Sequence, residues 1–373
     1  MRILTVTKRQ YMNRDLLDDH FGRFRELPMA LARRGHEVRG LCLSYDQRGN
    51  GQVADEDQHS EVSVIWDSVD LGASRIGGLV RFAKLGRQIA HSFEPDVIWA
   101  GSDGLYGPLG ELIAARGMGA FVFDVYDDFD GFASMRIPGA RALYHRACRN
   151  ADGVTSFSDA MTSHIVDDVG RTGPTVTLVN GTDTRLFRPM DKSQCRSILG
   201  LPGLGRFIGV AGSLSGRDGL ATLLSAFETL AGADPDVHLV VAGPRGGETR
   251  IPTHDRIHDL GMVPYEQMPV VLNSLDVGVV LPREGRAGTL GFPYRAYEML
   301  ACMVPIVAVD VGAMPGLLAD TRDSLFQAQD VDDLVRAVRA RLDDGRVPKA
   351  PVPDWDEVAE SLEQFLGRII VAS

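Results

Sequence analysis

Residues suited to binding an anion are concentrated between residues 281 and 310. The first part of this stretch is a loop that contains Gly285, Gly288 and Gly291. Arg295 and Glu298 follow three residues apart, which places them on nearly the same face of a helix. A glycine loop that leads into a helix offers free backbone N–H groups and the positive end of the helix dipole, and both attract anions. The stretch therefore predicts an anion site, although an ordinary strand–helix–strand unit with a surface Arg–Glu pair would contain the same residues.

The elements that position these residues are indicated by the apolar runs around them. Residues 277–281 are apolar and predict a buried parallel strand. Pro293 favours the start of a helix, which should end near residues 302–303 because Pro305 disfavours helical geometry at the residue before it. Residues 306–309 predict the next strand. The predicted order is strand, glycine loop, helix and strand.

Two further glycine-containing loops follow predicted strands, which cover residues 207–211 and 237–242. Ligands of parallel α/β sheets bind beyond the carboxyl ends of the strands, so three loops are expected to converge: residues 212–219, 243–247 and 283–292. These loops contain or adjoin Arg217, Arg245, Arg283, Arg286 and Arg295. Glycine loops, helix N-termini and several arginines suit a diphosphate, whereas any one of these arginines alone would be interpreted as a solvated surface charge.

Strands and helices alternate along the whole chain. In the first half, strands are predicted over residues 3–7, 36–43, 62–66, 97–100, 121–125, 153–156 and 175–179, and helices over residues 24–34, 79–91, 109–115, 138–150 and 160–166. Residues 8–22 and 49–59 are polar and predict loops. The second half repeats the alternation and ends with helices over residues 331–342 and 355–369. This pattern predicts parallel sheets covered by helices on both faces.

Composition and charge exclude several classes of protein. The 373 residues are 44% hydrophobic and 24% charged, as in ordinary globular proteins, and the net charge is -11. Acidic residues outnumber basic ones in both halves, so nucleic acid is not an expected partner. No apolar run approaches the roughly 18 residues of a membrane span. The four cysteines form no CxxC pair, which argues against a zinc site or a disulfide framework and fits a cytoplasmic protein.

One predicted helix suggests a contact with a membrane. The helix over residues 138–150 carries Arg141, His145 and Arg149 roughly along one face. These side chains form either an ordinary solvated face or a contact with a phosphate-bearing lipid at a membrane surface. The second interpretation places the protein at the inner face of the membrane through its N-terminal domain.

Several segments resemble a known family. They are residues 32–38 (ARRGHEV), residues 179–183 (VNGTD) with Phe187 and Pro189, residues 291–307 with their GF, Glu298 and PIV, and Trp355. With these segments the sequence resembles, over nearly its whole length, the retaining GT-B glycosyltransferases of the family-4 type. That group includes bacterial polysaccharide and lipopolysaccharide glycosyltransferases.

The resemblance implies a fold of the α/β class, GT-B, in which two Rossmann-like α/β/α domains face a central cleft. It implies an acceptor-binding domain over residues 1–185, a nucleotide-sugar-binding domain over residues 186–352 and a crossover helix over residues 353–373 that packs on the first domain. The implied activity moves a sugar from a nucleotide diphosphate sugar to a hydroxyl of a glycan or lipid-linked acceptor, with retention, in surface polysaccharide synthesis. No cofactor and no metal are expected, since arginines and backbone N–H groups can stabilise the leaving diphosphate.

The resemblance also implies the site residues. Glu298 matches the residue that binds the ribose, residues 212–219 match the diphosphate loop, and Val263 with Pro264 matches the segment that lines the base. The implied nucleotide-sugar-binding set is Gly212, Ser213, Arg217, Gly243, Val263, Pro264, Leu290, Gly291, Phe292, Arg295 and Glu298. Tyr126 and Asp127 fall where many members have His-Asp, and the implied acceptor-binding set is Asp103, Tyr126 and Asp127. The implied catalytic set is Asp127, Arg217, Arg295 and Glu298.

The sequence departs from the family pattern at several positions. Leu290 stands where the usual motif has its first glutamate, and Ser213 and Asp218 stand where the diphosphate loop usually has Arg and Lys. Residues 293–298 (PYRAYE) resemble a Pro–x–Lys–x–x–Glu variant, and this resemblance implies that Arg295 is a phosphate ligand. Three alternatives stay open: a phosphorylase of the same fold, a nucleotide-sugar epimerase, and a nucleotide-sugar-binding protein without catalysis.

Overall fold

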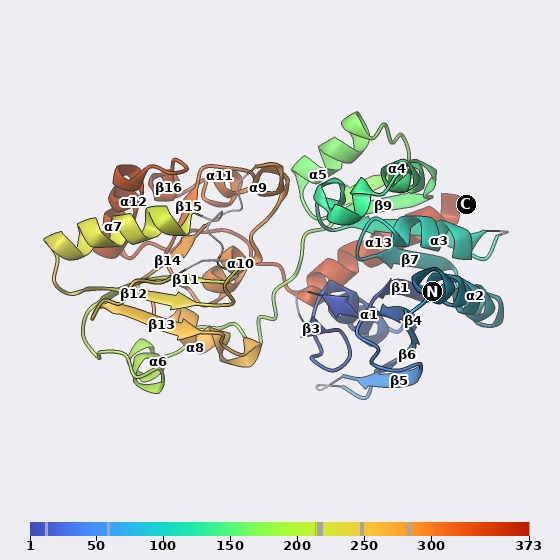
Figure 1. Ribbon diagram of the computed structural model, residues 1–373, viewed down its shortest axis with the longest axis horizontal. Helices are drawn as coiled ribbons and strands as arrows, with labels where there is room; N and C mark the ends of the chain where they lie inside the picture. The colour runs from blue at the N-terminus through green and yellow to red at the C-terminus, as the bar shows by residue number, and fades with distance from the viewer. Residues whose placement is uncertain are drawn as a thin grey trace. The chain divides into compact units, whose positions relative to one another are not determined.

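The computed structural model describes the chain except residues 12–13, 58–59, 116, 213, 215–218, 247–249, 282–284 and 373. The chain divides into two compact units (Figure 1). The first unit combines Met1–Gly181 with Trp355–Ser373, and the second is Thr182–Asp354. Each unit is built on one sheet whose main strands are parallel.

The sheet of the first unit has the strand order β10-β9-β8-β7-β1-β4-β6-β5. Its strands are β1 (Arg2–Lys8), β4 (Glu37–Ser44), β5 (Gly51–Glu56), β6 (Ser63–Asp70), β7 (Val97–Gly101), β8 (Ala120–Val125), β9 (Gly153–Ser156) and β10 (Thr175–Thr177). All pairs are parallel except β5 with β6. Since β1 pairs with both β4 and β7, the strand order reverses there, and ligands of doubly wound sheets bind at such a switch point.

Helices cover this sheet and include the end of the chain. They are α1 (Arg23–Arg33), α2 (Arg75–Phe93), α3 (Tyr106–Ala114), α4 (Ala140–Asn150), α5 (Asp159–Ser163) and α13 (Trp355–Ala372). A π-helical turn, His164–Asp168, continues α5. The C-terminal helix α13 packs against α1 and β8 within the first unit (Figure 1). Arg33 Nη2 and Asp356 Oδ1 form an ion pair at 2.7 Å across the contact between α1 and α13.

The sheet of the second unit has the strand order β13-β12-β11-β14-β15-β16, and every pair is parallel. Its strands are β11 (Arg206–Ala211), β12 (Val237–Ala242), β13 (Ile257–Gly261), β14 (Val277–Val280), β15 (Ile306–Val309) and β16 (Leu325–Phe326). The helices are α6 (Lys192–Ile198), α7 (Leu220–Ala233), α8 (Met268–Asn273), α9 (Arg286–Leu290), α10 (Tyr294–Ala301), α11 (Met314–Leu317) and α12 (Val331–Asp344). This is the strand order of dinucleotide-binding Rossmann folds, with its switch point between β11 and β14.

Two separate apolar cores hold the second unit together. One contains buried residues of α8 and α10, and the other contains buried residues of α7 and α12. Neighbouring residues of a strand contribute to different cores: Phe207 of β11 belongs to the first and Ile208 to the second. The inner strands of the sheet are therefore buried on both faces, which explains why β14 and β15 appear in the sequence as unbroken apolar runs.

The expected α/β fold with two Rossmann-like domains is confirmed, but three local predictions were wrong. Residues 49–59 were predicted as a loop, yet residues 51–56 form edge strand β5, whose side chains are exposed except Asp55. Residues 8–22 contain a short hairpin, β2 (Gln10–Tyr11) with β3 (Arg14–Asp15). The predicted glycine loop contains α9, where Gly285 O accepts N–H bonds from Gly288 and Thr289. Strands or turns this short or this exposed bury too little apolar surface to leave a periodic pattern.

Candidate active site

The loops after β11 and β12 lie side by side in the second unit. Gly212 and Gly243 have φ values of 129° and 131°, which other residues rarely adopt. A Cβ atom on Gly243 would lie 1.8 Å from the carbonyl oxygen of Gly212, so only glycine permits this approach. Leu214 N donates to Pro244 O at 2.8 Å. The structure thus brings two predicted donor loops together, while Ser213 and Arg217 lie outside the described residues.

The segment predicted to line the base follows the neighbouring strand β13. Gly243 N donates to Gly261 O at 2.7 Å, which ties the end of β13 to the loop after β12. Two residues later, Val263 is half-buried and packs against the core of α8 and α10, whereas Pro264 is exposed. Val263 and Pro264 therefore lie near the carboxyl edge of the sheet that also carries Gly212 and Gly243.

The stretch before α10 is held by ring stacking and by a glycine contact. The rings of Phe292 and Tyr297 stack with centroids 4.3 Å apart. A Cβ atom on Gly312, in the loop after β15, would lie 2.8 Å from the carbonyl oxygen of Gly288, so the two loops pack closely. Leu290 and Gly291 are half-buried between these contacts. Phe292 thus positions the start of α10 by packing on the helix that it precedes.

Arg295 and Glu298 lie on the same face of α10 and form a direct ion pair. Their side chains are 22% and 11% exposed. An arginine guanidinium suits a phosphate, and a carboxylate accepts hydrogen bonds from hydroxyl groups. The structure therefore brings together the two residues predicted to bind the diphosphate and the ribose.

In the first unit, the predicted acceptor residue Tyr126 is buried at the end of β8. Its hydroxyl donates to Ser102 O at 2.9 Å, and its ring contacts those of Tyr11, Phe24 and Phe129. Burial raises the pKa of Tyr126 well above its ordinary value. These contacts give Tyr126 a positioning role: it ties the loop after β7 to the loop after β8.

The three aspartates that follow Tyr126 have different surroundings. Asp130 has a largely buried carboxylate that meets His145 Nε2 at 3.0 Å, Arg141 Nε at 3.2 Å and His164 Nε2 at 3.3 Å. Asp128 is buried, whereas Asp127 is half-buried and accepts the Asp128 N–H at 2.8 Å. The acidic segment is thus a structured turn that sets Asp127 apart from its neighbours.

Two of the three basic residues predicted along one face of α4 contact Asp130. They are Arg141 and His145, and the Arg141 side chain stays 60% exposed. Arg149 Nη1 donates to Val169 O at 3.1 Å. These contacts within the unit reduce the basic surface that the helix offers to a lipid phosphate.

Lys8, which the sequence reasoning did not single out, belongs with the predicted acceptor residues. It ends β1, and Asp103 follows β7, so the two flank the switch point of the first sheet. Burial lowers the pKa of Lys8, while the carboxylates of Asp103 and Asp127 act in the opposite direction. Burial also raises the pKa of Asp103, whose Oδ1 accepts the Leu105 N–H at 2.9 Å. The missed signal was a lysine at the carboxyl end of the first strand.

A buried ion pair, also missed from the sequence, anchors the start of α1. Arg23 contacts Asp124 through two bonds, Nε to Oδ2 at 2.8 Å and Nη2 to Oδ1 at 3.0 Å. Its Nη1 donates to Asn180 Oδ1 at 2.7 Å. The Thr155 hydroxyl also donates to Asp124. The network joins α1, β8 and the VNGTD segment, which assigns a structural role to that segment's asparagine.

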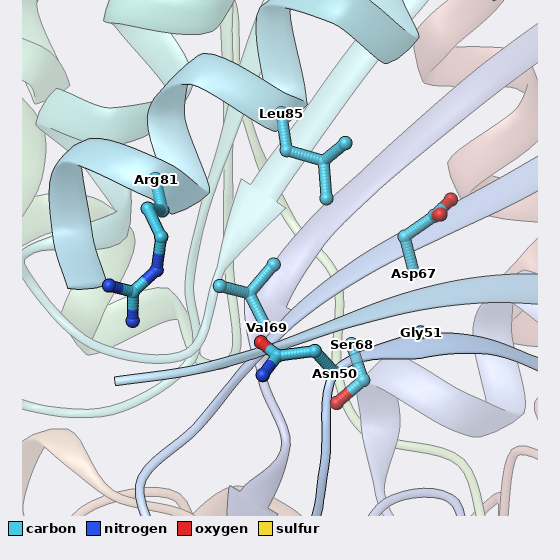
Figure 2. A pocket seen from close by; sticks show the side chains of 7 residues that line it. All are labelled: Asn50, Gly51, Asp67, Ser68, Val69, Arg81 and Leu85. Atoms are coloured by element: carbon cyan, nitrogen blue, oxygen red, sulfur yellow. The ribbon is translucent and has the colours of Figure 1, made fainter. Parts of the chain in front are cut away.

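A pocket of about 260 Å³ lies elsewhere in the first unit, beside β5, β6 and α2 (Figure 2). It is lined by Asn50, Gly51, Asp67, Ser68, Val69, Arg81 and Leu85. Asp67 pairs with Arg39 at 3.0 Å, and Arg81 Nη2 donates to Asp70 O at 3.1 Å. The pocket is at the β5 end of the sheet, and none of the predicted site residues lines it.

Comparison with known proteins gives matches in both units. Residues 23–181 match the glycosyl transferase 4-like domain, and residues 205–344 match the glycosyl transferases group 1 model. The GDP-mannose-dependent monoacylated alpha-(1-6)-phosphatidylinositol monomannoside mannosyltransferase of Corynebacterium glutamicum is 24% identical over 75% of this chain and 78% of that protein. The lipopolysaccharide core biosynthesis mannosyltransferase LpsB of Rhizobium meliloti is 27% identical over 52% of this chain and 60% of LpsB. The match to LpsB therefore spans less than two thirds of that relative.

Solved structures with the same fold cover the whole chain. The sucrose-phosphate synthase of Thermosynechococcus elongatus has a TM-score of 0.77 and 18% identity, with 100% of both chains covered. Anabaena HepE, solved in complex with UDP-glucose, has a TM-score of 0.68 and 18% identity, covering 100% of this chain and 99% of that one. At this level of identity the likeness concerns the fold.

Proposed function

Because the chain belongs to the glycosyltransferases of the family-4 type, with the GT-B fold, we propose that it transfers a sugar from a nucleotide diphosphate sugar to an acceptor hydroxyl with retention of the anomeric configuration. The observation that carries the proposal is the carboxyl edge of the second sheet. There the paired glycine loops at Gly212 and Gly243 occur on the same edge as the loop that leads to Arg295 and Glu298. Glycine loops, a guanidinium and a carboxylate are the groups that a nucleotide diphosphate requires.

In this proposal each group of the donor has its own contact. Glu298 accepts hydrogen bonds from the ribose hydroxyls, and Arg295 with the loop N–H groups binds the diphosphate. Val263 and Pro264 line the base. Arg217 lies outside the described residues, and we assign it to the diphosphate because its loop follows β11 at the switch point of the sheet. Leu290, Gly291 and Phe292 lie next to the transferred sugar.

The reaction breaks the bond between the anomeric carbon and the diphosphate oxygen and forms a bond from the acceptor oxygen to the same face of that carbon. The acceptor proton passes to the leaving diphosphate. Negative charge grows on the diphosphate, and Arg295 with the N–H groups stabilises it without a metal ion. Asp127 orients the acceptor or stabilises the positive charge on the sugar ring, and it forms no covalent intermediate.

The relatives support the substrate classes. The relative from Corynebacterium glutamicum is named for GDP-mannose and a phosphatidylinositol mannoside, LpsB for the lipopolysaccharide core, and HepE was solved with UDP-glucose. We therefore propose a nucleotide sugar as donor and a glycan or lipid-linked acceptor in surface polysaccharide synthesis. Among the residues that the structure describes, no helix combines the length and apolarity needed to cross a membrane. We propose peripheral contact of the N-terminal unit with the inner membrane face, where a lipid-linked acceptor would be met.

Incubation with a panel of UDP, GDP and TDP sugars tests the proposal, with release of the nucleoside diphosphate measured with and without acceptors. Acceptor-dependent release together with a product of unchanged anomeric configuration by NMR is expected. Conversion of the donor sugar without acceptor indicates an epimerase, acceptance of inorganic phosphate a phosphorylase, and binding without turnover a non-catalytic protein. An inverted product would contradict retention. Complete loss of activity in EDTA would contradict the metal-free diphosphate site.

A further inference from the structure

Four polar or aromatic side chains gather at the carboxyl ends of β1, β4 and β7 in the first unit. Lys8 ends β1, Tyr11 lies on β2, Tyr45 follows β4, and Asp103 follows β7. These strands are neighbours in the order β7-β1-β4, at the switch point of the sheet. The four residues, called the switch-point cluster here, occupy the place where doubly wound sheets bind their ligands.

The contacts of the cluster leave it reachable from solvent. Lys8 Nζ lies 5.5 Å from the centroid of the Tyr11 ring. The hydroxyls of Tyr45 and Tyr106 are 3.4 Å apart, and Tyr45 is 39% exposed. Lys8, Tyr11 and Asp103 are half-buried. An ammonium group, a carboxylate and two tyrosine rings therefore border one partly exposed site.

The formal charges of the cluster itself cancel, and the carboxylate of Asp127, which also acts on Lys8, makes the surroundings negative in sum. Lys8 supplies the positive charge, and it interacts with the carboxylates of both Asp103 and Asp127. Burial and the negative charge of Asp103 raise the pKa of Tyr45 to about 12. The adjacent Arg9 is buried, and its guanidinium binds Asp15 at 2.9 Å and Asp18 at 2.9 Å. Arg14, on β3, lies with its guanidinium over the ring of Phe21 at 5.0 Å. Arg9 and Arg14, the arginines nearest to Lys8 in the sequence, are thus engaged by other groups.

We propose that the switch-point cluster binds an uncharged, hydroxyl-rich ring, a sugar or cyclitol that carries the accepting hydroxyl, and that it disfavours a ring bearing a phosphate. This inference rests on the proposed function and names the acceptor class. A sugar hydroxyl donates to Asp103 and accepts from Lys8 at the same time, and the apolar face of the ring packs on tyrosine. A phosphate only accepts hydrogen bonds and meets two carboxylates at close range, so like charges repel it.

In this arrangement Lys8 and Asp103 are positioning residues. They hold the acceptor ring at the edge of the sheet while Asp127, which follows β8, faces the hydroxyl that reacts. Because Lys8 and Asp103 carry opposite charges, substituting one or the other should change the preference for uncharged over phosphorylated rings in opposite directions. Removing the positive charge should increase the bias against phosphate, and removing the negative charge should decrease it.

The test uses matched pairs of rings, methyl α-mannoside against mannose 6-phosphate and myo-inositol against myo-inositol 1-phosphate. Affinity is measured by calorimetry and saturation-transfer NMR on the full chain in the presence of a nucleoside diphosphate. We expect at least one neutral ring to bind. Its phosphorylated partner should bind at least about tenfold more weakly, because close like charges repel. D103N should reduce the ratio of the affinity for the neutral ring to the affinity for the phosphorylated ring. K8M should weaken the neutral ring by about ten- to a hundredfold, as for a lost hydrogen bond to a charged group, and widen the ratio.

Two matched controls alter charges away from the cluster. K84M changes an exposed lysine of α2, and D236N changes an exposed aspartate in the turn before β12. Both should leave the affinities and their ratio as in the unaltered protein. Circular dichroism and the affinity for the nucleotide show whether K8M and D103N remain folded. If either variant unfolds, the affinity ratio of neutral to phosphorylated rings in the unaltered protein still tests whether the cluster disfavours phosphate.

Equal or tighter binding of the phosphorylated rings, or no binding of any neutral ring, would overturn the inference. An unchanged ratio in folded K8M and D103N would do so as well. Failure of the proposed function is seen separately, because it would appear as an absence of nucleoside diphosphate release from every nucleotide sugar with every acceptor. Release that requires a phosphorylated acceptor would contradict the inference while leaving the glycosyltransferase activity intact.

Discussion

Arg295 and Glu298 form an ion pair across one turn of α10, with Nη1 of the arginine against Oε2 of the glutamate. Both side chains are largely shielded from solvent, at 22% and 11% exposure. The residues predicted to bind the diphosphate and the ribose therefore neutralise each other. The ion pair couples the two side chains, so in nucleotide binding the two residues should act as one unit.

Glu298→Ala should weaken nucleotide binding by at least about tenfold, because hydrogen bonds to a charged group contribute about 1.5–3 kcal/mol each. Calorimetry with UDP, GDP and TDP measures the effect, and Glu228→Ala, on the exposed face of α7, is the matched control. The effects of Arg295→Ala and Glu298→Ala should not add in the double variant, since each removes the other's partner. Unchanged affinity for every nucleotide would remove Glu298 from the site.

Asp127→Asn should lower turnover by about a hundredfold with donor affinity nearly intact, since positioned acid–base groups contribute at least that much. Asp130→Asn is the informative comparison, because its carboxylate is engaged by His145, His164 and Arg141. It should lower the free energy of unfolding by about 1–3 kcal/mol. Steady-state kinetics and urea unfolding separate the two effects. Full turnover in Asp127→Asn would place the reaction elsewhere.

Leu290→Glu should reduce turnover of the natural donor. Leucine offers no hydrogen-bond acceptor and tolerates a methyl group or hydrogen, so we predict a 6-deoxy donor such as a rhamnose. Kinetics with matched deoxy and fully hydroxylated nucleotide sugars measure the preference. Higher turnover in the variant, or a strict preference for the fully hydroxylated sugar, would favour the alternative that Glu284, outside the described residues, or a backbone group takes the role of the missing acid.

The second unit should lose stability in mild acid through His238 and His258. His238 Nδ1 lies 3.0 Å from His258 Nε2, and burial lowers the pKa of both. The unfolded chain has histidine pKa values near about 6.5 and therefore binds more protons than the folded chain below that pH. The stabilisation is thus present above about pH 6.5 and is lost as the pH falls through the lowered folded values. Urea unfolding between neutral and acidic pH should show this slope, and His258→Gln should flatten it; an equal slope in the variant would exclude the pair.

Charge reversal on α4 tests the membrane contact. Arg141→Glu with Arg149→Glu should reduce binding to vesicles of anionic phospholipid by about a kcal/mol per reversed residue or more. Arg146→Glu, on the same helix and paired with Glu111, serves as control for the position on the helix. Co-sedimentation with vesicles and turnover of a lipid-linked acceptor are measured together. If both stay unchanged in the double variant, α4 does not meet the membrane.

The sequence by itself determined the fold class and most elements of regular structure. Buried parallel strands such as β14 and β15 appear as unbroken apolar runs, and α12 repeats its apolar residues at helical spacing, so each is recognisable locally. The same reasoning predicted Gly243, Arg295 and Glu298 as site residues, because a glycine after a strand and an acid within the following helix are also local signals. It missed β5 and α9, which bury little apolar surface.

Only the tertiary structure decided which polar residues meet. Lys8 and Asp103 are far apart in the sequence and interact electrostatically because β1 pairs with β7, and Arg23 reaches Asp124 because α1 begins beside the end of β8. The tertiary structure also shows how the surroundings of the aspartates in the acidic turn differ: Asp130 is engaged by α4 and the π-helical turn, and Asp127 is not part of that cluster. Strand order is fixed by contacts between distant segments, and residue spacing carries only local information, so the partners of a charged side chain at a sheet edge follow from the fold.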